Sequence, residues 1–369
     1  MAPLVWALAR LVWVPMSIRY VFSLFQYSLF SREYTTHPGA LLHNYLYVIM
    51  MQVVTMALEA GFRKFDTGEA DGWYDQKSVG KALQDYFAAP LLLQGQDACV
   101  ATADDGKTCV PPKTVTCGMQ DLRVSTKIAP WDLTSADTIR QHAKESRMEL
   151  VGFCDVEADQ YPLDVYYIHA PQCWEGWHPR CDDGNLPSDV LNLTEAWHAM
   201  EAVVALDHSA QRIGVSNVHS YHLEALIADI KMRQERGDTN PPPRMPDVLQ
   251  YFADPIQPSK EERRVCAEHG IEFVSFSTLG ENHLDDKGNP VPGNHVLTAP
   301  IIKNLAAKYE RSGAEVVLSW ALQNDMSVIP KSSNKEHIQE LAHMLKDNPT
   351  FLDDKDSVKI EDELEYTML

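Results

Sequence analysis

Residues 57–83, ALEAGFRKFDTGEADGWYDQKSVGKAL, indicate the fold class of this chain. They predict the end of a helix at Gly61, a short strand over 62–66, a polar turn, and a second helix over 76–87. Glycine is typical of the position just after a helix, where the backbone often becomes left-handed. A strand enclosed by two helices is the repeating unit of a parallel sheet covered by helices.

The same alternation of strands and helices continues to residue 345. Strands are predicted at 62–66, 122–127, 163–168, 212–216, 248–251, 271–276 and 327–329. Helices are predicted at 44–61, 76–87, 135–150, 191–206, 222–234, 260–269, 301–311, 314–323 and 335–345. This order predicts an α/β fold, a (β/α)8 TIM barrel whose first strand is atypical or incomplete. The missing strand is expected before the first helix, where the candidate residues 31–43 have the composition of a loop.

The chain divides into three regions by composition. Residues 1–43 form an apolar N-terminal segment of uncertain role, and residues 351–369 form an acidic tail without clear periodicity. The barrel is expected over 44–350, with insertions at 88–120 and 172–187 that are rich in turn-forming residues.

Charge and cysteine content limit the possible partners. The net charge is −20 in 369 residues, which argues against binding to nucleic acid because phosphate recognition needs basic surfaces. The seven cysteines include no CxxC motif and no spacing with histidine that suggests zinc, so no metal is expected. Their clustering in the two insertions suggests disulfide bonds and an oxidising compartment, but an odd number cannot pair fully within one chain.

The apolar segment over residues 3–30 has two interpretations. Arg10 and Arg19 interrupt it, and the uncharged run that begins at Tyr20 is too short to span a bilayer. It is either a helix that contacts a membrane while its arginines reach the interface, or an apolar helix that packs on the domain. A cytoplasmic location is favoured, with association to an endomembrane as the alternative.

Four polar residues lie at or just beyond the ends of predicted strands: Asp66, Tyr74, Lys127 and His169. In a barrel of parallel strands, these ends meet at one face, where active sites form. A lysine held by a carboxylate can stabilise a phenolate and lower the pKa of a tyrosine, which then donates a proton. A histidine can orient a carbonyl oxygen by hydrogen bonding. Taken alone, each residue is more commonly a cap, a packing residue or a solvated charge than a functional group.

The order of these segments, followed by IGVSN at 213–217 and IPKSSN at 329–334, resembles the aldo-keto reductase family over roughly residues 50–345. The resemblance implies an NADPH-dependent reduction of an aldehyde or ketone to an alcohol, with NADH as a possible substitute. Tyr74 would be the proton donor, Lys127 and Asp66 would tune it, and His169 would orient the carbonyl of a small-molecule substrate.

The resemblance also implies a set of cofactor-binding residues. Those for the nicotinamide are Ser216, Asn217, Gln250 and the stacking Phe276, those along the pyrophosphate are Ser277 and Leu279, and those near the adenosine 2′-phosphate are Lys331, Ser332 and His337. Trp131, Trp174 and Trp177 could wall an apolar substrate pocket or serve only in packing.

The chain departs from the family pattern in several places. The spacing from Asp66 to Tyr74 is longer than usual, His337 replaces a common arginine, and Leu341 replaces a common asparagine. The glycine-rich first strand of the family is not recognisable in residues 1–43. Two alternatives therefore stand beside a reductase: a nicotinamide-binding, non-catalytic or regulatory relative associated with a membrane, and a degenerate barrel that binds no cofactor.

Overall fold

The computed structural model describes residues 22–23, 39–95, 101–102, 109–110, 119, 121–154, 161–182, 190–280 and 293–365. Within these residues, one parallel sheet contains eight strands in the order β1-β2-β5-β6-β7-β8-β9-β10. Its strands are β1 (Phe22–Ser23), β2 (Lys64–Asp66), β5 (Arg123–Ile128), β6 (Leu163–Ile168), β7 (Ala210–Ser216), β8 (Val248–Phe252), β9 (Glu272–Phe276) and β10 (Ser327–Val328). The insertion after α2 contains a separate antiparallel pair, β3 (Ala101–Thr102) and β4 (Cys109–Val110).

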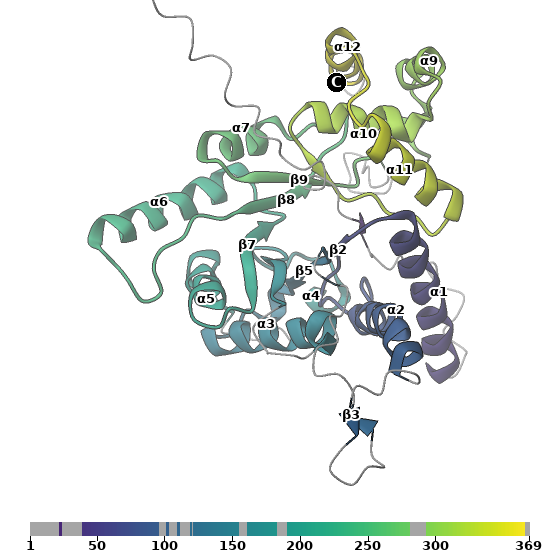
Figure 1. Ribbon diagram of the computed structural model, residues 1–369. Coiled ribbons are helices and arrows are strands. Elements are labelled where there is room, and N and C mark those ends of the chain that lie inside the picture. Colours follow the sequence, from purple (N-terminus) through teal and green to yellow (C-terminus); the bar gives the residue numbers. More distant parts are fainter. Residues whose placement is uncertain are drawn as a thin grey trace, which may run out of the picture.

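Helices surround the strands (Figure 1). They are α1 (Gly39–Ala60), α2 (Gln76–Gly95), α3 (Ala136–Val151), α4 (Pro179–Asp182), α5 (Leu193–Ala205), α6 (Ser220–Arg236), α7 (Lys260–His269), α8 (His295–Thr298), α9 (Pro300–Tyr309), α10 (Gly313–Gln323), α11 (Lys335–Asp347) and α12 (Asp354–Glu365). Short 3-10 helices cover Pro130–Asp132 and Gly152–Cys154. Capping residues determine where several helices begin or end. Ser312 caps the start of α10 in a capping box with Glu315, and Gly237 ends α6 in a left-handed conformation.

The first strand lies where the sequence did not place it. We expected it within residues 31–43, but β1 is formed by Phe22–Ser23, inside the apolar segment, and it pairs in parallel with Phe65 and Asp66 of β2. A two-residue strand is too short to show a pattern of alternating polarity, which explains why the sequence did not reveal it. The eight parallel strands and their helices have the order of a (β/α)8 barrel, although no pairing joins β10 to β1 within the described residues.

Side chains alternate between two cores along the strands. Tyr166 and Ile168 of β6 pack into the large core between sheet and helices, whereas Val165 and Tyr167 join Val248, Val274 and Ile329 in a smaller cluster inside the sheet. Inside the sheet, Arg212 forms ion pairs with Asp164 at 3.1 Å and Glu272 at 2.6 Å. This inner space holds a cavity of only about 10 Å³, so the strands enclose a packed interior, as in other barrels.

Three boundaries differ from the sequence predictions. Helix α1 begins at Gly39, before the predicted start of the barrel, and α2 continues to Gly95, into the predicted insertion. The acidic tail forms helix α12, which buries Ile360 and Leu364. So few apolar residues give no clear helical periodicity, although they suffice to dock the helix.

Most of the apolar segment over residues 3–30 lies outside the described residues. Among the residues that the structure describes, no helix has the length and apolar character needed to cross a bilayer. The predicted contact of residues 3–30 with a membrane stays a prediction.

The close packing of α2 on α3 depends on Gly80. A Cβ atom at this position would lie 2.3 Å from the backbone oxygen of Glu149, a contact that only a shift of one helix could relieve. This close contact between α2 and α3 also allows hydrogen bonds between the helices. Gln76, at the start of α2, donates to Ser146 Oγ at 3.0 Å and to Glu149 Oε2 at 2.8 Å on α3.

We expect Gly80→Ala to lower the free energy of unfolding by about 1–3 kcal/mol, because the added methyl group overpacks the interface between the two helices. Denaturant unfolding followed by circular dichroism would measure the change. Gln84→Ala, at an exposed position of the same helix, is the control and should change stability by less than about 0.5 kcal/mol. Equal stability of Gly80→Ala and the unmodified chain would contradict this account of the packing.

Candidate active site

The structure brings together the four residues predicted from the strand ends. Asp66 is the last residue of β2, Lys127 lies near the end of β5, and His169 directly follows β6. Tyr74 lies in the turn between β2 and α2. Backbone hydrogen bonds continue the strand pairing beyond β2, from Thr67 N to Ser125 O at 2.9 Å and from Glu69 N to Lys127 O at 3.0 Å, so the turn starts in a fixed position.

Lys127 is the centre of the site. Its side chain is fully buried, and Nζ donates to Asp66 Oδ2 at 2.5 Å, to the backbone oxygen of Thr67 at 2.7 Å and to the hydroxyl oxygen of Tyr74 at 3.4 Å. All three partners are acceptors, which match the three donors of an ammonium group. Burial lowers the pKa of Lys127, and the carboxylate of Asp66 opposes that shift.

The longer spacing between Asp66 and Tyr74 is absorbed by a tight turn. Tyr74 N donates to Ala70 O at 3.0 Å, which folds the inserted residues back over β2. The Tyr74 ring then packs directly on Gly68, where a Cβ atom would lie 2.9 Å from two ring carbons. Gly68 therefore leaves the space in which the phenol ring reaches Lys127, and the sequence alone contained no signal for this contact.

The Tyr74 hydroxyl is a weak acid in this structure. Burial raises its pKa well above the usual value, and the nearby Asp66 carboxylate raises it further. The lowering expected from Lys127 is therefore not found, because desolvation of a phenolate outweighs the attraction of an ammonium that Asp66 already pairs. The phenol keeps its proton near neutral pH, as a proton donor must.

His169 is neutral near pH 7. Its pKa lies well below the usual range, mainly because of burial and also because the Lys127 ammonium repels an imidazolium. Nδ1 is buried and has no hydrogen-bond partner among the described residues, and the ring centroid lies 5.6 Å from that of Tyr74. An unpaired buried N–H is rarer than an unpaired acceptor, which favours the tautomer with its proton on Nε2.

Three predicted nicotinamide ligands border the same four residues. Asn217 Nδ2 donates to the backbone oxygen of His169 at 2.8 Å and to Ser216 Oγ at 3.2 Å. Gln250 Nε2 donates to Asp66 Oδ1 at 3.0 Å, so its amide steadies the carboxylate. Their contact with a nicotinamide stays a prediction.

The other predicted cofactor residues follow the next two strands. Phe276 ends β9, packs on the inner cluster and lies edge-to-face with Phe252, with the ring centroids 6.0 Å apart. Ser277 and Leu279 follow on the same loop. Lys331, Ser332 and His337 lie on the segment between β10 and the first turn of α11, where Asn334 caps the helix by accepting from His337 N at 3.2 Å.

Sequence analysis did not single out Trp73 or His178, which complete an aromatic cluster beside His169. The Trp73 ring contacts the rings of Trp177, His178 and His169 at centroid distances of 4.7, 5.1 and 6.0 Å. The disulfide bonds suggested by the clustered cysteines are confirmed for one pair, because Cys173 and Cys181 are bonded. Cys266 is free and buried, whereas Cys99 and Cys117 lie outside the described residues.

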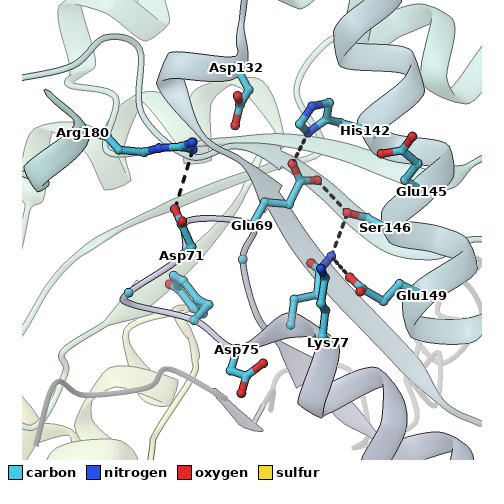
Figure 2. A pocket seen from close by; sticks show the side chains of 14 residues that line it. Glu69, Asp71, Asp75, Lys77, Asp132, His142, Glu145, Ser146, Glu149 and Arg180 are labelled. Carbon is cyan, nitrogen blue, oxygen red and sulfur yellow. Dashed lines mark hydrogen bonds and ion pairs between the residues drawn. The ribbon is translucent and has the colours of Figure 1, made fainter. Parts of the chain in front are cut away.

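A cavity of about 770 Å³ lies on the α3 side of the turn that carries Tyr74 (Figure 2). Acidic side chains dominate its lining: Glu69, Asp71, Asp75, Asp132, Glu145 and Glu149. Glu69 is held there by Ser146 Oγ at 2.7 Å and Tyr166 Oη at 2.8 Å. Tyr74 borders this cavity but Asp66, Lys127 and His169 do not, so it lies behind the turn and not over the four central residues.

Comparison with known proteins shows the family of the chain. The family model described as the aldo/keto reductase family matches residues 47–362. The chain belongs to the aldo/keto reductase family. The solved structure of a Bombyx mori aldo-keto reductase in complex with NADP is similar in fold, with a TM-score of 0.62 and 20% identity over 93% of this chain and 88% of that chain.

Curated aldo-keto reductases are similar over parts of their length. The 7-acetyl-epi-neemfruitin B aldo-keto reductase of Melia azedarach is 32% identical over 48% of this chain and 50% of its own length. Aldo-keto reductase family 1 member A1 of Mus musculus is 29% identical over 76% of this chain and 72% of its own length. The match thus spans about half of the first relative and nearly three quarters of the second.

The lowered pKa of His169 predicts a pH dependence of stability. The unfolded chain binds a proton at this residue near its usual pKa of about 6.5, and the folded chain does so only at lower pH. The contribution is therefore fully present above about pH 6.5 and is lost as the pH falls through the folded pKa. Between about pH 6.5 and about pH 5 the loss is at most about 2 kcal/mol.

We expect His169→Asn to lose less stability than the unmodified chain over this pH range, as measured by denaturant unfolding at several pH values. His343→Asn is the control, because His343 is exposed on α11, and it should follow the unmodified chain. Parallel pH profiles for the unmodified chain and His169→Asn would mean that His169 is not held neutral by the fold.

Proposed function

We propose that this aldo-keto reductase reduces an aldehyde or ketone to an alcohol with NADPH. The observation that carries the proposal is the buried Lys127 ammonium, which joins the Asp66 carboxylate to the Tyr74 hydroxyl beside His169. A buried ion pair of this kind costs desolvation energy, and such arrangements are concentrated at functional sites.

The hydrogen bonds support Tyr74 as the proton donor. Because Lys127 Nζ donates to the phenol oxygen, the O–H hydrogen of Tyr74 is directed elsewhere and can reach a substrate oxygen. When a carbonyl oxygen gains negative charge during reduction, it takes this proton, and the adjacent ammonium stabilises the phenolate that remains. Asp66 and the Thr67 carbonyl hold the ammonium in place throughout.

His169 orients the substrate in this proposal. A neutral imidazole with its proton on Nε2 can donate to the carbonyl oxygen without protonating it. Asn217 holds the backbone of His169, and Lys127 and Asp66 complete the polar surroundings. The carbonyl oxygen would thus accept from both Tyr74 and His169.

The residues present suit a phosphorylated nicotinamide cofactor, which supplies the hydride when it is bound. Ser216, Asn217 and Gln250 offer hydroxyl and amide groups at one end of the site. Lys331 and Ser332 precede α11, whose N-terminal end favours anions, and a lysine with a hydroxyl group suits a phosphate. Lys331 is the cation that we assign to this phosphate.

Tyr74→Phe tests the assignment of the proton donor. The variant should retain NADPH binding, measured by quenching of tryptophan fluorescence, and lose at least about a hundredfold in turnover of small aldehydes. Tyr86→Phe, a change of the same kind on the outer helix α2, is the control and should keep full activity. Full activity of Tyr74→Phe would overturn the mechanism. An unmodified chain that binds NADPH and reduces no carbonyl compound would be the non-catalytic relative.

Lys331→Ala tests the phosphate site. The Kd for NADPH should rise by about tenfold to a hundredfold, because one charge-assisted hydrogen bond is lost, while the Kd for NADH should hardly change. Lys335→Ala, in the first turn of α11, is the matched control for a general loss of positive charge. An equal weakening of both nucleotides would contradict the assignment of Lys331 to the 2′-phosphate.

A further inference from the structure

Two segments that follow strands β2 and β6 meet beside His169. One is the turn over residues 68–74, lengthened between Asp66 and Tyr74, and the other is the loop over residues 173–182. His178 Nε2 donates to the backbone oxygen of Asp71 at 2.7 Å, and His178 Nδ1 accepts from Arg180 N at 3.1 Å. Each segment therefore fixes the other through His178.

The loop is closed by the disulfide bond between Cys173 and Cys181. Their Cα atoms are 5.3 Å apart, which is within the usual range for a disulfide. The closed ring contains Trp177, whose indole lies 4.7 Å from the Trp73 ring and 5.2 Å from the His169 ring, measured between centroids. The bridge thus limits the positions that the Trp177 backbone can take relative to His169.

These two indoles lie against His169 and are more exposed than the central groups. Tyr74 is 9% exposed and His169 is 5% exposed, whereas Trp73 and Trp177 are only partly buried. The two cysteines pack on the same small cluster as these indoles and Tyr74. A substrate that contacts His169 from the side of Trp73 and Trp177 therefore also contacts their indoles. Flat, apolar groups gain from stacking on an indole, but polyhydroxylated chains lose hydration there.

We propose that Trp177, held in place by the Cys173–Cys181 disulfide, makes the site selective for flat, apolar carbonyl compounds such as aromatic aldehydes. This inference rests on the proposed carbonyl reduction and specifies its substrate class. The bridge acts on selectivity through Trp177, and the proton donor and cofactor residues work without it.

The selectivity of the site then depends on the redox state of Cys173 and Cys181. A dithiol reagent breaks the Sγ–Sγ bond with two electrons and two protons, which yields two cysteine thiols while the reagent becomes a cyclic disulfide. Both cysteines are partly exposed, so the reagent can reach them. Disulfides persist in oxidising compartments, where the selective form would prevail.

The test measures kcat/KM of the full chain with NADPH for 4-nitrobenzaldehyde and for glyceraldehyde. Trp177→Ala, and the double variant Cys173→Ser with Cys181→Ser, should each lower the ratio of aromatic to polar activity by about tenfold. Treatment of the unmodified chain with dithiothreitol should do the same. Glu175→Ala is the matched control: it changes an exposed residue of the same loop, and its ratio should stay unchanged.

Combining the changes distinguishes a positioning role from general damage. If the bridge acts through Trp177, dithiothreitol should have no further effect on the ratio once Trp177 is alanine, since coupled changes are not additive. A ratio that still falls on reduction of Trp177→Ala would overturn the proposal. Equal losses for both aldehydes in the cysteine variant, or free thiols at Cys173 and Cys181 in unreduced protein, would overturn it as well.

A binding measurement separates this proposal from the catalytic one. Tyr74→Phe loaded with NADPH should bind 4-nitrobenzaldehyde, and reduction of the disulfide should weaken that binding by about tenfold. If the unmodified chain reduces neither aldehyde but this binding responds to the disulfide, the proposed catalysis fails and the aromatic site stands. If turnover occurs but neither selectivity nor binding responds, only the aromatic site fails.

Discussion

The burial of the Lys127 ammonium is the constraint on which the rest of the site depends. A fully buried charge is tolerated only with a complete set of partners, and here these are a carboxylate, a backbone carbonyl and a phenol oxygen. The carboxylate must therefore come from the neighbouring strand, and the pairing of Asp66 with Ser125 places it there. Gln250 satisfies the other oxygen of the same carboxylate from β8.

The packed interior of the sheet makes this arrangement rigid. Lys127, Tyr167 and Gly214 are paired neighbours across β5, β6 and β7. A Cβ atom on Gly214 would lie 2.7 Å from the Tyr167 ring, so the glycine leaves the space that this ring occupies beside Lys127. The ion pairs of Arg212 with Asp164 and Glu272 close the interior further along these strands. The strands thus supply fixed positions, and the loops beyond them supply the chemistry, as expected for a barrel.

The loops that follow β2 and β6 hold each other in place through side-chain contacts. The turn that carries Tyr74 is longer than usual in the family, and a longer loop alone would hold a phenol less firmly. Glu69 ties this turn to α3 and β6, His178 binds its backbone, and Trp177 packs on Trp73. The lengthened turn and the disulfide-closed loop are therefore best understood as one unit, in which each supports the side chains that the other presents to His169.

The sequence by itself determined the alternation of strands and helices, and it placed Asp66, Lys127 and His169 at strand ends, because these features follow from local patterns of polarity. The clustering of cysteines in the two insertions also suggested disulfide bonds, but not which cysteines pair. Only the tertiary structure decided that Phe22–Ser23 forms the first strand, that α12 docks on the barrel, and that Tyr74 reaches Lys127 across a lengthened turn. It alone revealed the raised pKa of Tyr74 and the contact between Trp73 and Trp177. These depend on burial and on residues far apart in the chain, which no local pattern records.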